Sequence, residues 1–145
     1  RAIEVRYDVN SGAMMERRPV RHVPLLGDVA AGTDVLAEEN VEELLPVPVD
    51  FTGDGELFML RVRGESMIEL GILDGDVVVA TQIANPNNGD IVVAGIPGGE
   101  ATIKTYSRSG AEVTLTPANA TMEPMRFTAD EVEIYGKVVT VMRRY

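Results

Sequence analysis

The feature that most constrains the fold is a series of short apolar runs, each of which ends in turn-forming residues. Three valines at 77–79 follow the turn Asp74-Gly75-Asp76, and the runs at 90–96 and 101–106 flank Pro97-Gly98-Gly99. Short runs rich in Val, Ile and Thr that are bounded by Gly, Pro, Asn and Asp are typical of β-strands. A Pro-Gly-Gly sequence between two such runs predicts a β-hairpin.

The same pattern recurs along the chain, and helical signals are few. Further predicted strands cover residues 57–63, 111–116, 131–135 and 137–142. Residues 38–45 and 67–71 are each predicted to form one or two helical turns. We therefore predict a mostly β fold, a compact antiparallel β domain with few short helical turns.

Composition limits both the size of the domain and its chemistry. The chain has 145 residues, of which 45% are hydrophobic, enough to build the core of one domain. It has no cysteine and one histidine, His22, which excludes disulfides and multi-histidine zinc sites and argues against a Ser-His-Asp triad. No apolar run approaches the roughly 18 residues that a membrane span requires. We expect a soluble, cytoplasmic protein with no metal, no cofactor and no membrane contact.

Charge is distributed unevenly along the chain. The net charge of −10 argues against binding of a nucleic-acid duplex by this chain alone. Residues 1–22 nevertheless carry more basic than acidic side chains, whereas the remainder is strongly acidic. We interpret residues 1–22 as a linker and residues 23–145 as the globular domain. Because the chain begins with Arg1 and not with Met, we expect it to be either a fragment of a longer polypeptide or a processed chain.

Serine and lysine are scarce, so few nucleophile–base pairs are possible. The serines are Ser11, Ser66, Ser107 and Ser109, and the lysines are Lys104 and Lys137. Without cysteine and with one histidine, a nucleophilic enzyme built on this chain has to pair Ser or Thr with Lys. Ser11 belongs to the predicted linker, and residues 107–110 have the composition of a turn.

Ser66 differs from the other serines in its position at the end of a predicted strand. It follows Gly64 by two residues, and a glycine there permits a sharp turn that exposes the serine Oγ and the adjacent amides. Ser66 is also well placed to cap the predicted helical turn at 67–71. The residues alone leave both interpretations open.

Lys104 lies within the predicted strand at 101–106, where a lysine is ordinarily a solvated surface residue. To act as a base it must be buried, because desolvation lowers the pKa of lysine from about 10.4 by as much as ~3–5 units. Lys137, at the start of another predicted strand, is the competing base. We interpret the acidic residues at 38–43 as a solvated face, His22 as exposed, and the carboxylates at 74 and 76 as parts of a turn.

Taken in order, several segments resemble the LexA repressor group of self-cleaving proteins. Val29-Ala30-Ala31-Gly32 resembles the self-cleavage site of that group, and Arg63-Gly64-Glu65-Ser66-Met67 resembles its nucleophile motif, with Glu65 where Asp is more usual. Residues 72–76 resemble the acidic turn that follows. Residues 88–94 and 99–104 resemble the strands that lead to and carry the catalytic lysine. Residues 1–5 resemble the end of the DNA-binding domain of the repressor.

The resemblance implies a fold of the LexA/signal-peptidase type and a mechanism. Ser66 is then the nucleophile and Lys104 the general base, and the bond between Ala31 and Gly32 is cut. Backbone amides near Glu65 and Ser66 hold the oxyanion. A RecA–single-stranded-DNA filament stimulates the reaction by favouring the docked form of the cleavage loop.

The resemblance also implies partners. A DNA-binding domain that precedes Arg1 binds operator DNA, and the whole protein is a homodimer held through its C-terminal strands, around residues 131–144. Cleavage between Ala31 and Gly32 separates the two halves and inactivates a repressor of the DNA-damage (SOS) response.

Two other functions stay open. The UmuD type, an accessory subunit of an error-prone polymerase, has the same fold and serine–lysine pair, but Ala31 stands where that group commonly has Cys. A non-catalytic β interaction domain is the alternative from a different class. A signal peptidase shares the chemistry but needs a membrane anchor.

Overall fold

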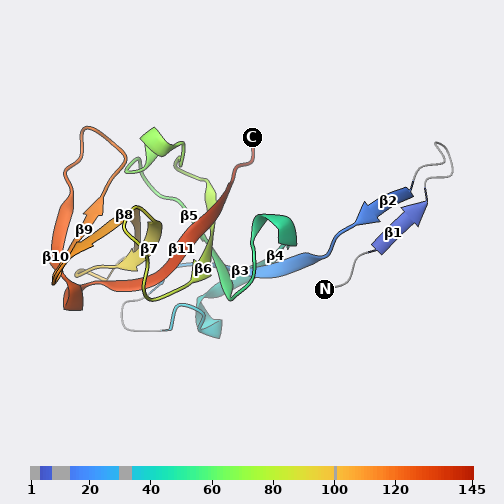
Figure 1. Cartoon of the computed structure of the whole chain (residues 1–145), viewed down its shortest axis with the longest axis horizontal. Helices are drawn as coiled ribbons and strands as arrows, with labels where there is room; N and C mark the ends of the chain where they lie inside the picture. Colours follow the sequence, from blue (N-terminus) through green and yellow to red (C-terminus); the bar gives the residue numbers. More distant parts are fainter. Residues whose placement is uncertain (1–3, 8–13, 30–33, 100) are drawn as a thin grey trace.

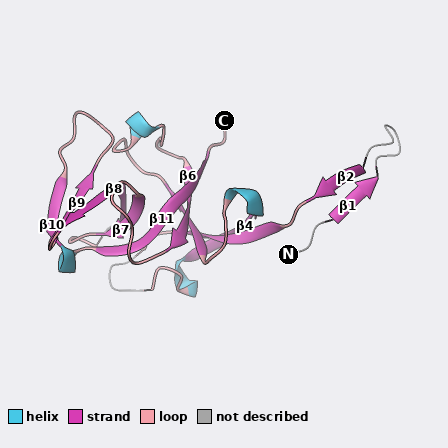
Figure 2. Cartoon of the chain, in the orientation of Figure 1, coloured by secondary structure: helices cyan, strands magenta, loops and turns pink. Residues whose placement is uncertain are grey.

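The computed structural model describes residues 4–7, 14–29, 34–99 and 101–145 (Figure 1). Strands dominate these residues, and the helical segments are short, as Figure 2 shows. The compact, mostly β fold is therefore confirmed. The predicted cleavage site, Ala31 and Gly32, lies outside the described residues.

The elements follow one another along the chain with short connections. The strands are β1 (Glu4–Tyr7), β2 (Met14–Arg17), β3 (Val20–Leu26), β4 (Val41–Pro48), β5 (Leu57–Arg61), β6 (Val77–Gln82), β7 (Ile91–Gly95), β8 (Ala101–Ser109), β9 (Glu112–Thr116), β10 (Met125–Thr128) and β11 (Glu133–Met142). The short 3-10 helices are η1 (Glu38–Asn40), η2 (Val49–Phe51), η3 (Ile68–Leu70) and η4 (Ala129–Glu131).

Nine strands form one sheet in the order β10-β9-β8-β7-β11-β6-β5-β3-β4. All neighbouring pairs are antiparallel except β3 and β5, which are parallel. The strands β1 and β2 form a separate hairpin that projects from the body of the molecule in Figure 1. The predicted hairpin around residues 97–99 is present as the β7–β8 connection.

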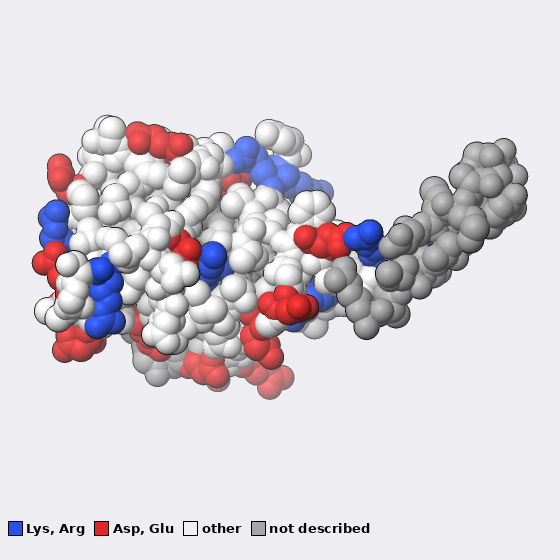
Figure 3. All heavy atoms as spheres, in the orientation of Figure 1, with Lys and Arg blue, Asp and Glu red and all other residues white. Residues whose placement is uncertain are grey.

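The predicted linker contributes to the main sheet. β3 begins at Val20, inside the segment that the sequence assigned to the linker, and pairs with both β4 and β5. His22 lies on this strand and is exposed, as predicted. The acidic side chains at 38, 39, 42 and 43 are also exposed. Figure 3 shows acidic groups at several places around the margin of the face drawn, with basic groups between them.

The predicted helix at 38–45 is wrong beyond its first residues. Only Glu38–Asn40 is helical, and β4 begins at Val41. As a strand, residues 41–45 pair with β3, and the same strand continues to Val47, which is 1% exposed. The second predicted helical turn is confirmed, because η3 covers residues 68–70.

Two further boundaries differ from the prediction. Residues 107–109 were expected in a turn but continue β8, because they pair with residues 112–114 of β9. The two strands predicted at 131–135 and 137–142 are one strand, β11, which pairs with β7 and then with β6. Gly136 pairs with both β6 and β7, and the backbone there leaves no room for a side chain, since a Cβ would lie 2.6 Å from the carbonyl oxygen of Thr81.

The core consists of three buried apolar clusters on the sheet. The first contains Phe58 of β5, Val93 of β7 and Met67, which is 1% exposed. Because Met67 directly follows Ser66, the core anchors the loop that carries the predicted nucleophile. Within the described part of the chain, no helix is long and apolar enough to cross a membrane.

Candidate functional site

The structure brings together Ser66 and Lys104, which are 38 residues apart in the chain. Lys104 Nζ lies 3.1 Å from Ser66 Oγ, within hydrogen-bond distance. Lys137 instead pairs with Asp90 at 3.4 Å on the surface. Ser107 and Ser109 lie in the last part of β8, paired with β9. Among the described serines and lysines, this contact therefore selects one of the pairs that the sequence left open.

Local geometry explains why Ser66 is accessible to Lys104. Gly64 has φ +85°, in the left-handed region that favours glycine, so the chain turns sharply as it leaves β5. The Gly64 N–H donates to Asp74 Oδ1 at 2.7 Å, which fixes this turn. The N-cap residue of η3 is Met67, without a side-chain cap bond. The interpretation of Ser66 as a helix cap is therefore wrong.

Lys104 is buried, and the interpretation of a solvated strand lysine is wrong for this residue. Its residue exposure is 8%, on a strand covered by the Ser66 loop. Besides Ser66, its Nζ has two neighbours, Thr102 Oγ1 at 2.5 Å and the Ile103 carbonyl oxygen at 3.1 Å. Thr102 is two residues away and so projects from the same face of β8.

Burial changes the acid–base chemistry of Lys104. Desolvation lowers the pKa of its ammonium from the ordinary value near 10.5. A larger fraction of the side chain is therefore neutral near pH 7 than in an exposed lysine. A neutral amine within 3.1 Å of a hydroxyl can accept its proton and so generate a nucleophile.

A cavity of about 640 Å³ opens beside this pair of side chains. Its walls come from segments far apart in the sequence: residues 26–29, 60–63 and 101–104, Ser66 and Met67, Val93, Ile96 and Gly99, and Pro117, Met122, Glu123 and Met125. Val29, 9% exposed, is the last described residue before the predicted cleavage site and lines this cavity. The chain that leads to Ala31 thus runs along the wall of the cavity that holds Ser66.

The acidic turn after Ser66 contains an ion pair that sequence reasoning missed. Asp76 is only 1% exposed, and Arg143 donates to its carboxylate from Nε at 2.7 Å and from Nη2 at 2.8 Å. The hydrogen bond from Arg143 is the largest cause that lowers the pKa of Asp76 below its usual range. The turn itself is as predicted, but the partner lies 67 residues later.

A second residue that the sequence did not single out is Asn119, in the loop between β9 and β10. Its Nδ2 donates to the carbonyl oxygen of Glu65 at 2.8 Å. In the same loop, the Ala118 N–H donates to the carbonyl oxygen of Ser66 at 2.7 Å. A polar residue in a loop that begins at Pro117 gives no signal that would distinguish it from ordinary turn chemistry.

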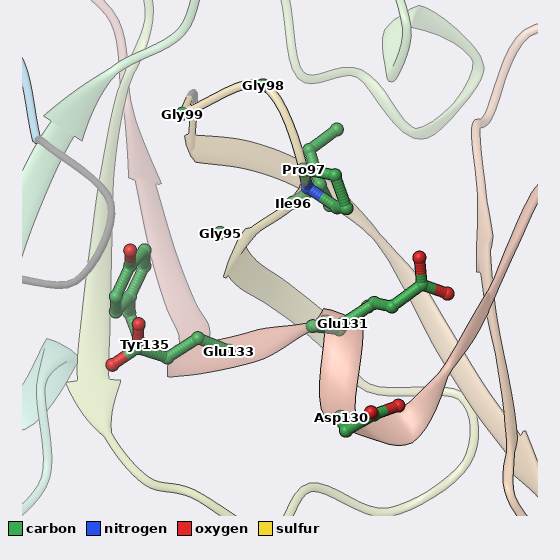
Figure 4. Close-up of a pocket in the computed structure, with 10 residues that line it drawn as sticks. Gly95, Ile96, Pro97, Gly98, Gly99, Asp130, Glu131, Glu133 and Tyr135 are labelled. Carbon is green, nitrogen blue, oxygen red and sulfur yellow. The ribbon is translucent and has the colours of Figure 1, made fainter.

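A second, smaller cavity of about 280 Å³ lies between the β7–β8 connection and the start of β11. Figure 4 shows Tyr135 on one side of it and Asp130 and Glu131 on another. Burial is the first cause that raises the pKa of Tyr135, and the charge of Glu133 is the second. Neither serine nor lysine is among the described residues that line this cavity.

The fold and the larger cavity have the features of a serine peptidase-type domain: a β domain in which a serine hydroxyl contacts a buried lysine. The comparison with known families gives the same class. The Peptidase S24-like family matches residues 24–139, and the chain belongs to that family.

Curated relatives narrow the similarity to LexA repressors. The chain is 50% identical over 127 residues to the LexA repressor of Ruminiclostridium cellulolyticum, covering 88% of this chain and 58% of that protein. It is 49% identical over 144 residues to that of Pelotomaculum thermopropionicum, covering 99% and 68%. The LexA repressor of Syntrophomonas wolfei is 48% identical over 122 residues, covering 84% and 58%. The resemblance to the LexA group is confirmed, and the chain spans between 58% and 68% of the length of these relatives.

Proposed function

We propose that this chain is the self-cleaving and dimerising part of a LexA-type repressor of the DNA-damage response. The observation that carries the proposal is the 3.1 Å contact between Ser66 Oγ and the buried Nζ of Lys104. It lies in a cavity whose wall continues to Val29, two residues before the predicted scissile bond. The family supports a peptidase, and the names of the relatives support a repressor. A repressor that cleaves itself accounts for both.

The reaction uses Ser66 as nucleophile and Lys104 as general base. Neutral Lys104 accepts the hydroxyl proton as Ser66 Oγ bonds to the carbonyl carbon of Ala31. The C–N bond to Gly32 then breaks, and the Lys104 ammonium returns its proton to the departing amine. Water hydrolyses the resulting ester between Ser66 and Ala31, again with Lys104 as base. Backbone N–H groups near residues 65 and 66 stabilise the oxyanion.

Substrate and catalyst belong to one chain, so proximity is built in. Val29 on one side of the predicted cleavage site is 9% exposed, and Val35 on the other side is 2% exposed. Both belong to the same apolar cluster as Met67. The described residues on either side of the proposed scissile bond thus pack into the cluster that also contains Met67, the residue after Ser66. Control of the reaction then requires a conformational equilibrium, which a RecA–single-stranded-DNA filament shifts by binding the cleavable form more tightly.

The proposed partners are a second copy of the chain and operator DNA. β11 presents Val139 and Val141 to solvent, at 40% and 39% exposure, and this apolar face supports a homodimer formed through residues 131–144. Operator DNA is bound through a separate domain that precedes Arg1, and the repressor acts in the cytoplasm. The net charge of −10 of this chain disfavours contact with DNA, which supports DNA binding by a separate domain.

Incubation of the purified chain at pH 10 without any partner tests the proposal. Deprotonation of Lys104 by the solvent then replaces the stimulus, and mass spectrometry is expected to find fragments 1–31 and 32–145. Ser66→Ala and Lys104→Ala are expected to stay intact, while Lys137→Ala, the matched control, is cut like the wild type. A wild-type chain that stays uncut after prolonged incubation favours a non-catalytic interaction domain and overturns the proposal.

A further inference from the structure

The loop between β9 and β10 clamps the Ser66 loop through its backbone. Asn119 Nδ2 donates to the carbonyl oxygen of Glu65 at 2.8 Å, and the Ala118 N–H donates to that of Ser66 at 2.7 Å. In return, the Glu69 N–H donates to the carbonyl oxygen of Ala118 at 2.9 Å. The carbonyl groups of Glu65 and Ser66 are therefore both held by the loop between β9 and β10.

Asn119 is itself held in a defined orientation. The residue is 7% exposed, and its Oδ1 accepts hydrogen bonds from Thr121 N at 3.0 Å and Thr121 Oγ1 at 2.7 Å. Since Oδ1 faces these two donors, Nδ2 is the atom that faces the carbonyl of Glu65. A buried amide with both ends paired is rigid, and it transmits that rigidity to its partner.

Because the peptide group is planar, these hydrogen bonds also fix the direction of the N–H groups of Ser66 and Met67. In a planar trans peptide, the carbonyl and the following N–H point in opposite directions. When Asn119 holds the carbonyl of Glu65, the N–H of Ser66 points away from Asn119. In the same way, Ala118 directs the N–H of Met67. Neither of these N–H groups donates to another described residue, so both stay available to a ligand.

We propose that Asn119 is a positioning residue that holds the Ser66 N–H in place to stabilise the oxyanion during self-cleavage. The inference rests on the proposed function and deepens it by naming the side chain that preorganises the oxyanion site. Donors of this kind are effective because they are fixed before charge develops. Without the Nδ2 donor, the Glu65–Ser66 peptide is free to rotate, and the Ser66 N–H is no longer aimed at the developing charge.

The pH dependence of self-cleavage separates this role from that of Lys104. The midpoint of the rate profile reports deprotonation of the base, whereas the plateau at high pH reports stabilisation of the transition state. Asn119→Ala is expected to lower the plateau by about 10- to 100-fold and to leave the midpoint unchanged. Thr102→Val, which removes a neighbour of Lys104 Nζ, is expected to move the midpoint instead.

Three more variants keep the test specific to the hydrogen bond. Asn119→Asp conserves the shape and the bonds from Thr121 but removes the donor to Glu65, so its plateau falls as in Asn119→Ala. Thr121→Val removes one of the two bonds that orient the amide, so a smaller loss is expected. Asn88→Ala is the matched control, because Asn88 Oδ1 accepts from the Arg108 N–H at 2.8 Å in a different loop. Its plateau is expected to equal that of the wild type.

The outcomes distinguish the inference from the proposed function. A wild-type plateau in Asn119→Asp, a shifted midpoint in Asn119→Ala, or an equal loss in Asn88→Ala overturns the inference while self-cleavage stands. A wild-type chain that is not cut at pH 10 overturns the proposed function and the inference together. Thermal unfolding of each variant, measured in parallel, identifies any loss of rate that follows a loss of folded protein.

Discussion

Arg143 and Asp76 form an ion pair that ties the C-terminal end of the chain to the turn behind the Ser66 loop. The guanidinium donates twice to the carboxylate, at 2.7 and 2.8 Å, and Arg143 Nη2 also donates to the Gly71 carbonyl oxygen at 2.8 Å. Asp76 Oδ2 accepts in addition from the Leu73 N–H at 2.8 Å. The residues that follow the proposed nucleophile are thus held by the segment just after β11, the strand proposed to form the dimer.

This pair predicts a specific loss of stability in acid. Arg143 lowers the pKa of Asp76 in the folded chain, whereas an unfolded aspartate has a pKa of about 3.9. The stabilisation is therefore complete above the unfolded value and is lost as pH falls through the folded value. In Asp76→Asn the Tm at pH 7 is expected to fall by on the order of 5 °C, with a smaller further decrease in acid than the wild type shows. Circular dichroism melts from pH 7 to pH 2 measure both quantities, and parallel curves for the two proteins contradict the prediction.

Lys104 predicts a gain of stability as pH rises through the alkaline range. Burial lowers its folded-state pKa, so the unfolded chain binds more protons between the folded and unfolded values, and stability rises with pH in that window. Lys104→Met removes the desolvation cost and keeps a similar volume. We expect this variant to melt a few degrees above the wild type at pH 7, with the difference shrinking toward pH 10.

Ser66→Ala is the appropriate background for that measurement, because it prevents cleavage of the chain during the experiment. Lys137→Met is the control, since the Lys137 side chain is 42% exposed and pairs with Asp90 at 3.4 Å. An equal gain in stability from both lysine substitutions indicates that burial of Lys104 is not its cause.

The turn at Gly64 predicts a loss of cleavage that exceeds the loss of stability. Alanine at φ +85° costs about 1–2 kcal/mol in the left-handed region, and relief of that strain displaces Ser66 from Lys104. Gly53→Ala provides a matched control, because Gly53 has φ +69° and open space around a Cβ but lies in another loop. Similar urea midpoints are expected for the two variants, with cleavage at pH 10 slowed about tenfold or more only in Gly64→Ala. Equal rates in both variants contradict the role of this turn.

The sequence predicts the parts of the site that depend on local chemistry. Gly64 before Ser66 indicates a sharp turn, and the small number of serines and lysines leaves few candidate pairs. Turn residues and β-branched runs likewise indicate β5 through β9 to within a few residues. Burial of Lys104 is not predictable in this way, because alternation along β8 does not say which face another loop covers.

Contacts between distant segments explain the other differences between the sequence-based predictions and the structure. The partner of Asp76 lies 67 residues away, and that of Asn119 lies 54 residues away, so neither contact leaves a local pattern. The acidic run at 38–45 has a helical composition, but pairing with β3 extends it from Val41 onward. Tertiary pairing here outweighs local propensity, as it does where β8 continues through Ser109.

The exposed face of β11 predicts how the chain associates. Val139 and Val141 are about 40% exposed, on the part of β11 that runs beside β6 and has passed beyond its pairing with β7, and their side chains are free to contact a second copy. Val139→Glu with Val141→Glu places two charges in the proposed interface and is expected to weaken dimerisation on the order of 100-fold or more. Leu44→Glu is the control, because Leu44 is 59% exposed on the edge strand β4. Sedimentation velocity over a concentration series measures the association. A dimer that survives the double substitution but not Leu44→Glu places the interface on β4 instead.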